Sequence, residues 1–181
     1  MIETMKRVLA KCPDARLRLY DRGTEDRDSE EMLRRRIEAA GIPLEWPPAM
    51  SYGSYLATFD DVSVGLAPLS PESRFSRGKS FGKLLAYLDR MVPVVLSDTG
   101  EPARFFTGRT GLFATSTEEW TGSVIHLLKD RKVRSCLAGA AHVAFRSRLT
   151  SAATAARLSE VLLGKVERSQ DLRWKPITLQ T

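Results

Sequence analysis

The chain has 181 residues, of which 43% are hydrophobic and 28% charged, and its formal net charge is +6. This size and balance fit one soluble globular domain with a core of its own. No apolar stretch approaches the ~20 residues that a membrane-spanning helix needs, and the amphipathic N-terminal segment lacks the pattern of a signal peptide. Cys12 and Cys136 lie far apart, outside any metal-ligand spacing, so we expect reduced cytoplasmic thiols and no metal site.

Much of the positive charge is clustered at residues 34–36, 74–83 and 129–134. A basic surface favours anionic partners such as phosphates, acidic lipid headgroups or nucleic acid. Because aromatic residues are not interleaved with these clusters, we do not expect nucleic acid to bind. The arginines at 34–36 are most simply the solvated face of a helix.

The residue pattern predicts helices and strands that alternate along the chain. The first expected elements are a helix at 2–11, a strand at 15–20, a helix at 29–40, a strand at 42–46 and a helix at 51–59. A continuous apolar run at 62–69 predicts a strand that is buried on both faces. The later elements are a loop at 70–76, a helix at 77–90, strands at 92–97 and 111–115, and helices at 117–130, 131–147 and 151–168.

This alternation predicts an α/β fold in which helices cover both faces of a mostly parallel sheet. In open parallel sheets, ligands bind at the carboxyl ends of the strands, near the switch in strand order. Three turns are expected at that edge: residues 70–83, the turn at 98–100, and Pro47-Pro48. We therefore expect the functional site to lie among these three turns.

Residues 70–83, SPESRFSRGKSFGK, contain Gly78-Lys79-Ser80, which is the end of a phosphate-binding P-loop. The complete motif requires an earlier glycine that lets the backbone wrap the phosphates. That position holds Ser73, and the intervening residues are bulky and charged. A P-loop kinase or NTPase is therefore the least favoured function.

A series of further segments follows in a recognisable order: Asp61-Val62, residues 65–68 (GLAP), Lys79-Ser80 with Lys83, residues 93–95 (PVV), Ser97-Asp98, Gly100, and residues 108–112 (GRTGL), 118–120 (EEW) and 127–130 (LLKD). Together they resemble the C-terminal, donor-binding domain of GT-B glycosyltransferases of the group 1 family, over most of residues 10–150. The resemblance implies a Rossmann-like three-layer α/β/α domain at 1–150, half of a GT-B fold, whose first strand is missing. Residues 151–181 are expected to form a C-terminal helix and tail packed on the same domain.

The resemblance also implies a binding site for a UDP- or GDP-sugar donor, with no metal and no other cofactor. Backbone N–H groups and the positive end of a helix attract phosphate. The residues expected at the diphosphate are Arg74, Arg77, Lys79, Ser80, Phe81, Gly82 and Lys83. Those expected near the base and ribose are Trp46, Pro47, Tyr55 and Ala86, and Asp98, Thr99 and Gly100 form a second loop at the sheet edge.

Two positions depart from the family pattern. Gly78 and Ala86 stand where the family commonly has glutamates that bind the sugar and the ribose. Losing the ribose carboxylate removes about 1.5–3 kcal/mol of charged hydrogen bonding, so we expect weaker donor binding. No catalytic residue is assigned: His126 and His142 are expected to be structural or solvated, and a catalytic base would lie in the missing half.

The leading hypothesis is therefore the donor-binding half of a retaining glycosyltransferase that transfers a sugar to a hydroxyl acceptor in polysaccharide, lipopolysaccharide or glycan synthesis. The alternative is a degenerate, non-catalytic module that binds a nucleotide or a partner. The expected partner is the absent N-terminal acceptor-binding domain, from the same gene or a partner chain. We expect a cytoplasmic location, with peripheral contact at the inner face of the membrane through the basic surface.

Overall fold

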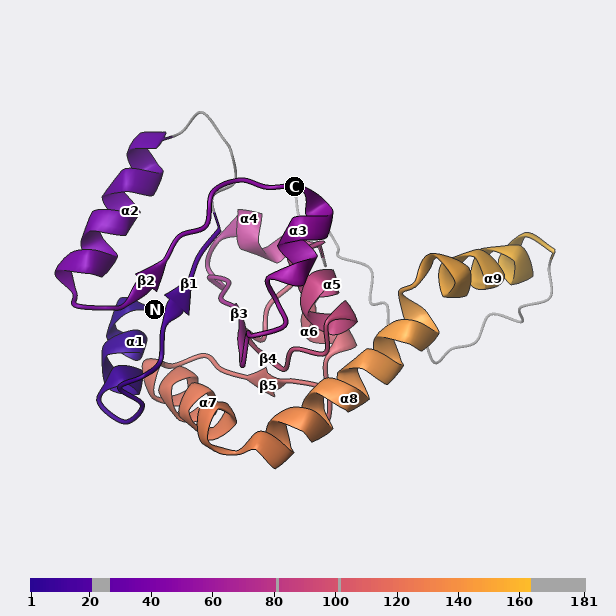
Figure 1. Ribbon diagram of the computed structural model, residues 1–181. Helices are drawn as coiled ribbons and strands as arrows, with labels where there is room; N and C mark the ends of the chain where they lie inside the picture. The colour runs from indigo at the N-terminus through magenta and orange to yellow at the C-terminus, as the bar shows by residue number, and fades with distance from the viewer. Residues whose placement is uncertain (21–26, 81, 101, 164–181) are drawn as a thin grey trace. The chain divides into compact units, whose positions relative to one another are not determined.

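The computed structural model describes residues 1–20, 27–80, 82–100 and 102–163 (Figure 1). Its helices are α1 (Ile2–Leu9), α2 (Arg27–Ala39), α3 (Tyr52–Ala57), α4 (Arg74–Arg77), α5 (Gly82–Asp89), α6 (Pro102–Phe105), α7 (Thr117–Lys129), α8 (Arg131–Arg148) and α9 (Ser151–Leu162). Its strands are β1 (Leu17–Arg18), β2 (Leu44–Glu45), β3 (Gly65–Ala67), β4 (Val94–Leu96) and β5 (Leu112–Phe113). The chain forms two compact units, residues 1–145 and 146–181.

The described strands of the first unit pair in parallel, which confirms the expected sheet type. β1 pairs with β2, and β4 lies between β3 and β5 in a second sheet. The doubly wound order is 3-2-1-4-5-6. The observed strands occupy that order as β2-β1 and β3-β4-β5, and no described strand stands between β1 and β3. Within residues 1–20, 27–80, 82–100 and 102–163, no strand takes the place of the first strand, which the sequence resemblance implies to be missing.

Helices cover both faces of the β3-β4-β5 sheet in this unit (Figure 1). On one face, α1 packs on α7, and Val8 and Leu127 meet Val95 of the central strand with none of their surface exposed. On the other face, α5 packs on β3, with the Tyr87 ring against Gly65. These contacts confirm the three-layer arrangement. The strand β4 is buried throughout, as its apolar sequence predicts.

Two local predictions were wrong. The single helix expected over 77–90 is replaced by the separate helices α4 and α5. The reason is capping, because the Ser73 hydroxyl accepts a hydrogen bond from the Ser76 N–H and starts a helical turn inside the expected loop. The expectation that residues 62–69 are buried on both faces also fails, since Leu66 and Ala67 of β3 are only half-buried.

The second unit includes α9, whose N-cap is Thr150. The Thr150 hydroxyl accepts a hydrogen bond from the Ala153 N–H. Residues 164–168 of the expected last helix lie outside the described residues, and the packing of 151–181 on the first domain stays a prediction. Within the described part of the chain, the helices are too short or too polar to cross a bilayer.

A pH-dependent contribution to stability is expected at the start of α7. Ser116 and Glu119 form a capping box there, and hydrogen bonds from Thr115 and Ser116 lower the pKa of Glu119 from 4.5 to about 2. A depressed carboxyl pKa stabilises the fold above pH 4.5, and this contribution is lost as the pH falls through about 2. Glu119→Gln should therefore be less stable than the natural chain at neutral pH, and the difference should shrink between these two values.

Urea unfolding at a series of pH values measures this difference. Ser116→Ala is the matched control, because it removes a hydroxyl that does not titrate. It should cost about 1 kcal/mol at neutral pH, and a loss should persist in acid. A Glu119→Gln difference that stays constant from neutral pH to pH 2 contradicts the expectation.

Candidate functional site

The loops after β3 and β4 are joined at the carboxyl edge of the sheet. The Ser97 side chain, which is buried, accepts a hydrogen bond of 2.9 Å from the Leu69 N–H. The Thr99 N–H donates to the Ser97 carbonyl at 2.8 Å, and Gly100 has a φ of 78°, which favours glycine. The turn at 98–100 and the beginning of the 70–83 segment are thus held beside each other, as predicted from the strand ends.

The 74–79 segment is a capped helical turn and lacks the open glycine loop of a P-loop. Arg74 and Arg77 are exposed on this turn, and the Arg77 guanidinium donates to the Pro71 carbonyl at 3.2 Å. The Lys79 Nζ lies 3.9 Å from the centre of the Phe75 ring, a cation–π contact. This segment therefore presents several cationic side chains, and it follows the loop in which Leu69 is hydrogen-bonded to Ser97.

The remaining residues expected at the diphosphate surround the start of α5. Ser80 is exposed, Gly82 is the first helical residue, and Lys83 is exposed one residue later. Phe81 lies outside the described residues. The beginning of α5 therefore follows the cationic turn directly, and its first amide groups supply the positive end of a helix dipole.

An aromatic cluster connects the end of β1 to α3 and α5. Tyr20 packs edge-to-face on Tyr55, with 4.9 Å between ring centres, and Phe59 lies 5.3 Å from Tyr87. Burial raises the pKa of Tyr87 to about 12, so its hydroxyl remains protonated at neutral pH. Ala86 is buried in the same region with 3% of its surface exposed. Its methyl group therefore serves packing and leaves no polar group for a ribose.

Trp46 and Pro47 follow β2 at the corresponding end of the other sheet, and both are half-buried. They lie beyond the parallel pairing of β2 with β1. Their role near a base stays a prediction.

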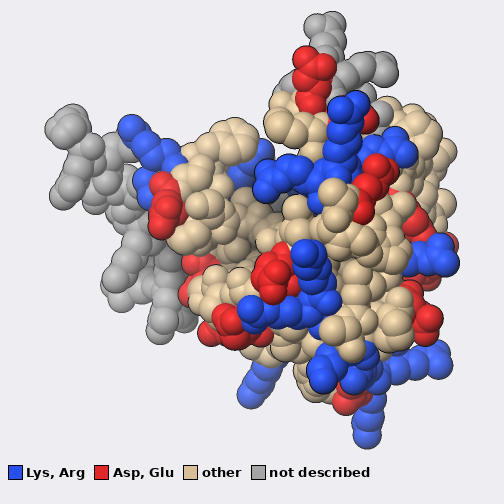
Figure 2. All heavy atoms as spheres, turned by 90° about the vertical axis from the view of Figure 1, so that its left-hand side faces the viewer, with Lys and Arg blue, Asp and Glu red and all other residues tan. Residues whose placement is uncertain are grey.

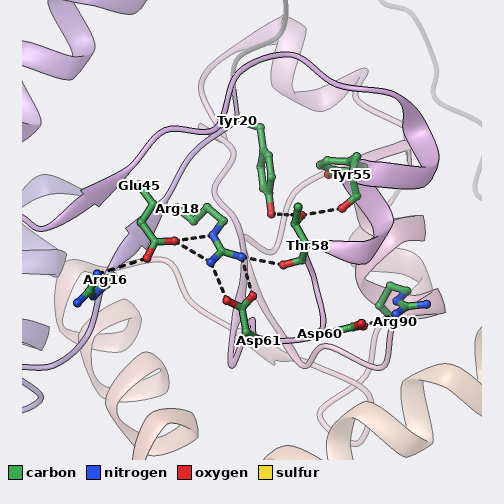
Figure 3. Close-up of polar contacts among 9 residues, drawn as sticks. All are labelled: Arg16, Arg18, Tyr20, Glu45, Tyr55, Thr58, Asp60, Asp61 and Arg90. Carbon is green, nitrogen blue, oxygen red and sulfur yellow. Dashed lines mark hydrogen bonds and ion pairs between the residues drawn. The ribbon is translucent and has the colours of Figure 1, made fainter.

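Sequence reasoning missed a polar side chain with several partners, Arg18 of β1 (Figure 3). Its guanidinium donates to Glu45 at 2.7 Å, to the Thr58 carbonyl at 2.7 Å, and to both carboxylate oxygens of Asp61 at 2.7 and 2.8 Å. The hydrogen bonds from Arg18 hold the pKa of Asp61 below its usual range. Arg18 thereby ties the β1-β2 sheet to the segment that enters β3. The sequence feature that could have indicated this role is a charged residue between two leucines of the predicted strand, Leu17 and Leu19.

Charged side chains of both signs are mixed on one face of the molecule and on α2. Figure 2 shows Lys and Arg interspersed with Asp and Glu on the face that it displays. On α2, Arg34 pairs with Glu38 at 3.0 Å and Arg35 with Glu31 at 2.9 Å. The interpretation of residues 34–36 as a solvated helix face agrees with these pairs.

The two histidines, which we expect to be structural or solvated, lie on the late helices α7 and α8. His142 contacts the Leu88 carbonyl through Nδ1 at 2.9 Å, a structural contact between α8 and α5, and His126 is exposed. Among residues 1–20, 27–80, 82–100 and 102–163, no cluster of three His, Cys, Asp or Glu side chains is arranged to hold a metal ion.

Comparison with known proteins identifies the fold through structure alone. No protein-family model matches the sequence, and no curated protein matches it. The C-terminal domain of a group 1 family glycosyl transferase (LpcC) from Francisella tularensis is 16% identical with a TM-score of 0.64, and the match covers 83% of this chain and 77% of that one.

Two longer enzymes have the same substructure. Sucrose-phosphate synthase from Thermosynechococcus elongatus is 15% identical with a TM-score of 0.67, covering 91% of this chain and 42% of that enzyme. The pneumococcal O-GlcNAc transferase GtfA, solved in complex with UDP and GlcNAc, is 12% identical with a TM-score of 0.62. That match covers 92% of this chain and 33% of GtfA. The chain thus spans less than half of either enzyme. It has the Rossmann-like fold of the C-terminal domains of GT-B glycosyltransferases.

Proposed function

We propose that this chain is the donor-binding half of a glycosyltransferase and binds the diphosphate of a UDP- or GDP-sugar at the carboxyl edge of the β3-β4-β5 sheet. The observation that carries the proposal is the fold. Leu69, just after β3, is hydrogen-bonded to Ser97 before the turn at 98–100, and the chain then continues into the basic segment at 74–83. Proteins with this fold include GtfA, solved with UDP.

Within this site, the cationic residues would contact phosphate oxygens and the start of α5 would direct N–H groups at them. Arg74 and Arg77 provide planar donors suited to two oxygens, whereas Lys79 and Lys83 provide compact charges. In the transfer, the bond between the sugar anomeric carbon and the diphosphate oxygen breaks, a bond to the acceptor oxygen forms, and the acceptor proton is released. Positive groups beside the leaving diphosphate stabilise the charge that develops there.

The acceptor side of the reaction requires groups beyond this domain. The missing N-terminal acceptor-binding domain, from the same gene or a partner chain, is the proposed source of these groups and of any catalytic base. We also propose that the enzyme is cytoplasmic and contacts the membrane peripherally. The support for membrane contact is the net charge of +6, which favours anionic lipid headgroups. Binding to anionic vesicles that weakens with salt tests that part, and no binding contradicts it.

A second candidate is a degenerate module that binds a partner without catalysis. It is favoured by Ala86, whose buried methyl group cannot hold a ribose hydroxyl, and by Gly78, which has no side chain. Both functions predict the same fold. They differ in whether a nucleoside diphosphate binds at the basic segment.

Lys79→Ala is expected to weaken UDP or GDP binding about tenfold or more, because it removes a charged donor to phosphate. Isothermal titration calorimetry of both diphosphates against the natural chain and the variant measures the effect. Arg35→Ala is the matched control, since it removes one positive charge from α2, where Arg35 pairs with Glu31. It should leave the affinity unchanged.

The outcomes separate the candidate functions. Equal losses for Lys79→Ala and Arg35→Ala contradict a specific phosphate contact. No binding of either diphosphate contradicts the donor site and supports the non-catalytic module. Magnesium-dependent triphosphate hydrolysis that disappears in Lys79→Ala supports the P-loop alternative instead.

A further inference from the structure

The position between β1 and β3 is lined by the open edges of two parallel sheets. β1 pairs on one side with β2, and β3 pairs on one side with β4. No described strand pairs with the other edge of either. Open strand edges present unpaired N–H and C=O groups and are sites where another strand can add.

A cavity of about 700 Å³ lies at this position, entirely within the first unit. We call it the groove. Its walls include Leu17 of β1 and Leu19 just after it, and Leu66 of β3 and Val64 just before it. Met5 of α1 and Leu128 of α7 also line it. The half-burial of Leu66, unexpected from the sequence, follows because its side chain borders the groove.

The backbone hydrogen bonds show which peptide groups face the groove. The Leu17 and Leu19 N–H groups donate to the Pro43 and Glu45 carbonyls of the β2 segment at 2.9 and 3.0 Å. Successive residues of a strand direct their peptide groups to opposite edges. The peptide groups of Arg18, between these two leucines, therefore face the groove.

The same argument applies to β3. The Gly65 N–H donates to the Pro93 carbonyl at 2.8 Å, and the Ala67 carbonyl accepts from the Ser97 N–H at 3.3 Å, so both residues face β4. The peptide groups of Leu66 therefore face the groove. There the Leu66 N–H hydrogen-bonds to Tyr87, which also lines the groove.

Two kinds of occupant could fill an apolar cavity of this size: a small apolar ligand or a polypeptide strand. A ligand without amide groups would leave the peptide groups of Arg18 and the carbonyl of Leu66 without partners from the sheet, at a cost for each buried group. A strand supplies N–H and C=O groups to both edges and apolar side chains to both faces. Of the charged residues at the groove, Arg18 pairs with Glu45 and Asp61, and Arg16 lies 3.7 Å from Glu45. Asp14 also lines the groove.

We propose that the groove binds one β-strand from polypeptide outside residues 1–181, inserted parallel to β1 and β3 so that the two sheets become one. Helices cover both faces of the sheet, so the strand must be apolar on both sides. We expect the sequence of this strand to be a continuous run of about five or six Val, Ile or Leu residues. The inference concerns assembly of the fold and does not depend on the proposed donor site.

The proposal is tested by joining the sequence VIVVIV to Met1 through a Gly-Ser linker, because Met1 itself lines the groove. The control extension has proline at its third and fourth positions, since proline lacks the N–H and does not fit a central strand. The strand extension should raise the midpoint of thermal unfolding by about 5 °C or more over the control. It should also slow hydrogen exchange of the Arg18 amide at least about tenfold.

A second variant keeps the test independent of the extension's own properties. Leu66→Lys, at the groove, should abolish the gain from the strand extension, whereas Leu158→Lys on the exposed surface of α9 should preserve it. Equal midpoints and equal amide exchange for the strand and proline extensions overturn the proposal. Dimerisation of the unextended chain that Leu66→Lys abolishes would identify a second copy as the occupant, and would also overturn it.

Discussion

Leu127→Ala is expected to lower the free energy of unfolding by about 2–5 kcal/mol, the largest effect of any substitution considered. Leu127 lies on α7 with none of its surface exposed and packs in one cluster with Val8, Val95 and Trp120. Truncation removes buried methyl groups and leaves a cavity between helices and sheet that the surrounding side chains fill only partly. Chemical denaturation with a two-state fit measures the loss.

The adjacent Leu128 provides the matched control. Leu128→Ala makes the same chemical change on the same helix, but this side chain is half-buried and borders the groove. Its truncation removes less buried area, and we expect a loss of about 1 kcal/mol. Equal losses at the two positions would contradict the assignment of Leu127 to the core and of Leu128 to the groove.

Gly65→Val is expected to cost about 1–3 kcal/mol through overpacking between β3 and α5. A Cβ atom at Gly65 would lie 2.9 Å from the Tyr87 ring, closer than non-bonded carbon atoms approach. Tyr87 is held between this strand and Phe59, so its ring cannot move away freely. Thermal and denaturant unfolding measure the destabilisation.

A double-mutant cycle tests whether this clash is the cause. Tyr87→Leu alone removes the aromatic contact with Phe59 and should itself destabilise the fold. Combined with Gly65→Val, it should recover part of the loss, which gives a favourable coupling energy. Strictly additive losses would show that the valine acts through some contact other than Tyr87.

Much of the fold was predictable because its strands have strong local signals. The apolar run that becomes β4 is buried throughout, and the turn after it lies beside the loop after β3, as the rule for parallel sheets predicts. The same rule placed the candidate site at this edge. The expectation that the first strand is missing came from the resemblance, and none of the described strands takes that place in the order.

The rest depended on contacts between residues distant in sequence. The Arg18 guanidinium joins Glu45, Thr58 and Asp61, which no local pattern indicates. The helical turn at 74–77 depends on a single cap from Ser73, which competes with loop conformations of similar local energy. Lys79 was predicted as a phosphate contact, but its pairing with Phe75 arises only from the geometry of this turn.

The measurement that tests the central claim most directly is a titration of the isotopically labelled chain with UDP and GDP, followed by backbone amide resonances. A donor site at the sheet edge predicts saturable shifts at Lys79, Gly82, Lys83 and Gly100, with little change at α2. These shifts should weaken in Lys79→Ala. Saturating amounts of both diphosphates that leave these amides unchanged, or that shift only amides elsewhere, would contradict the proposed donor site.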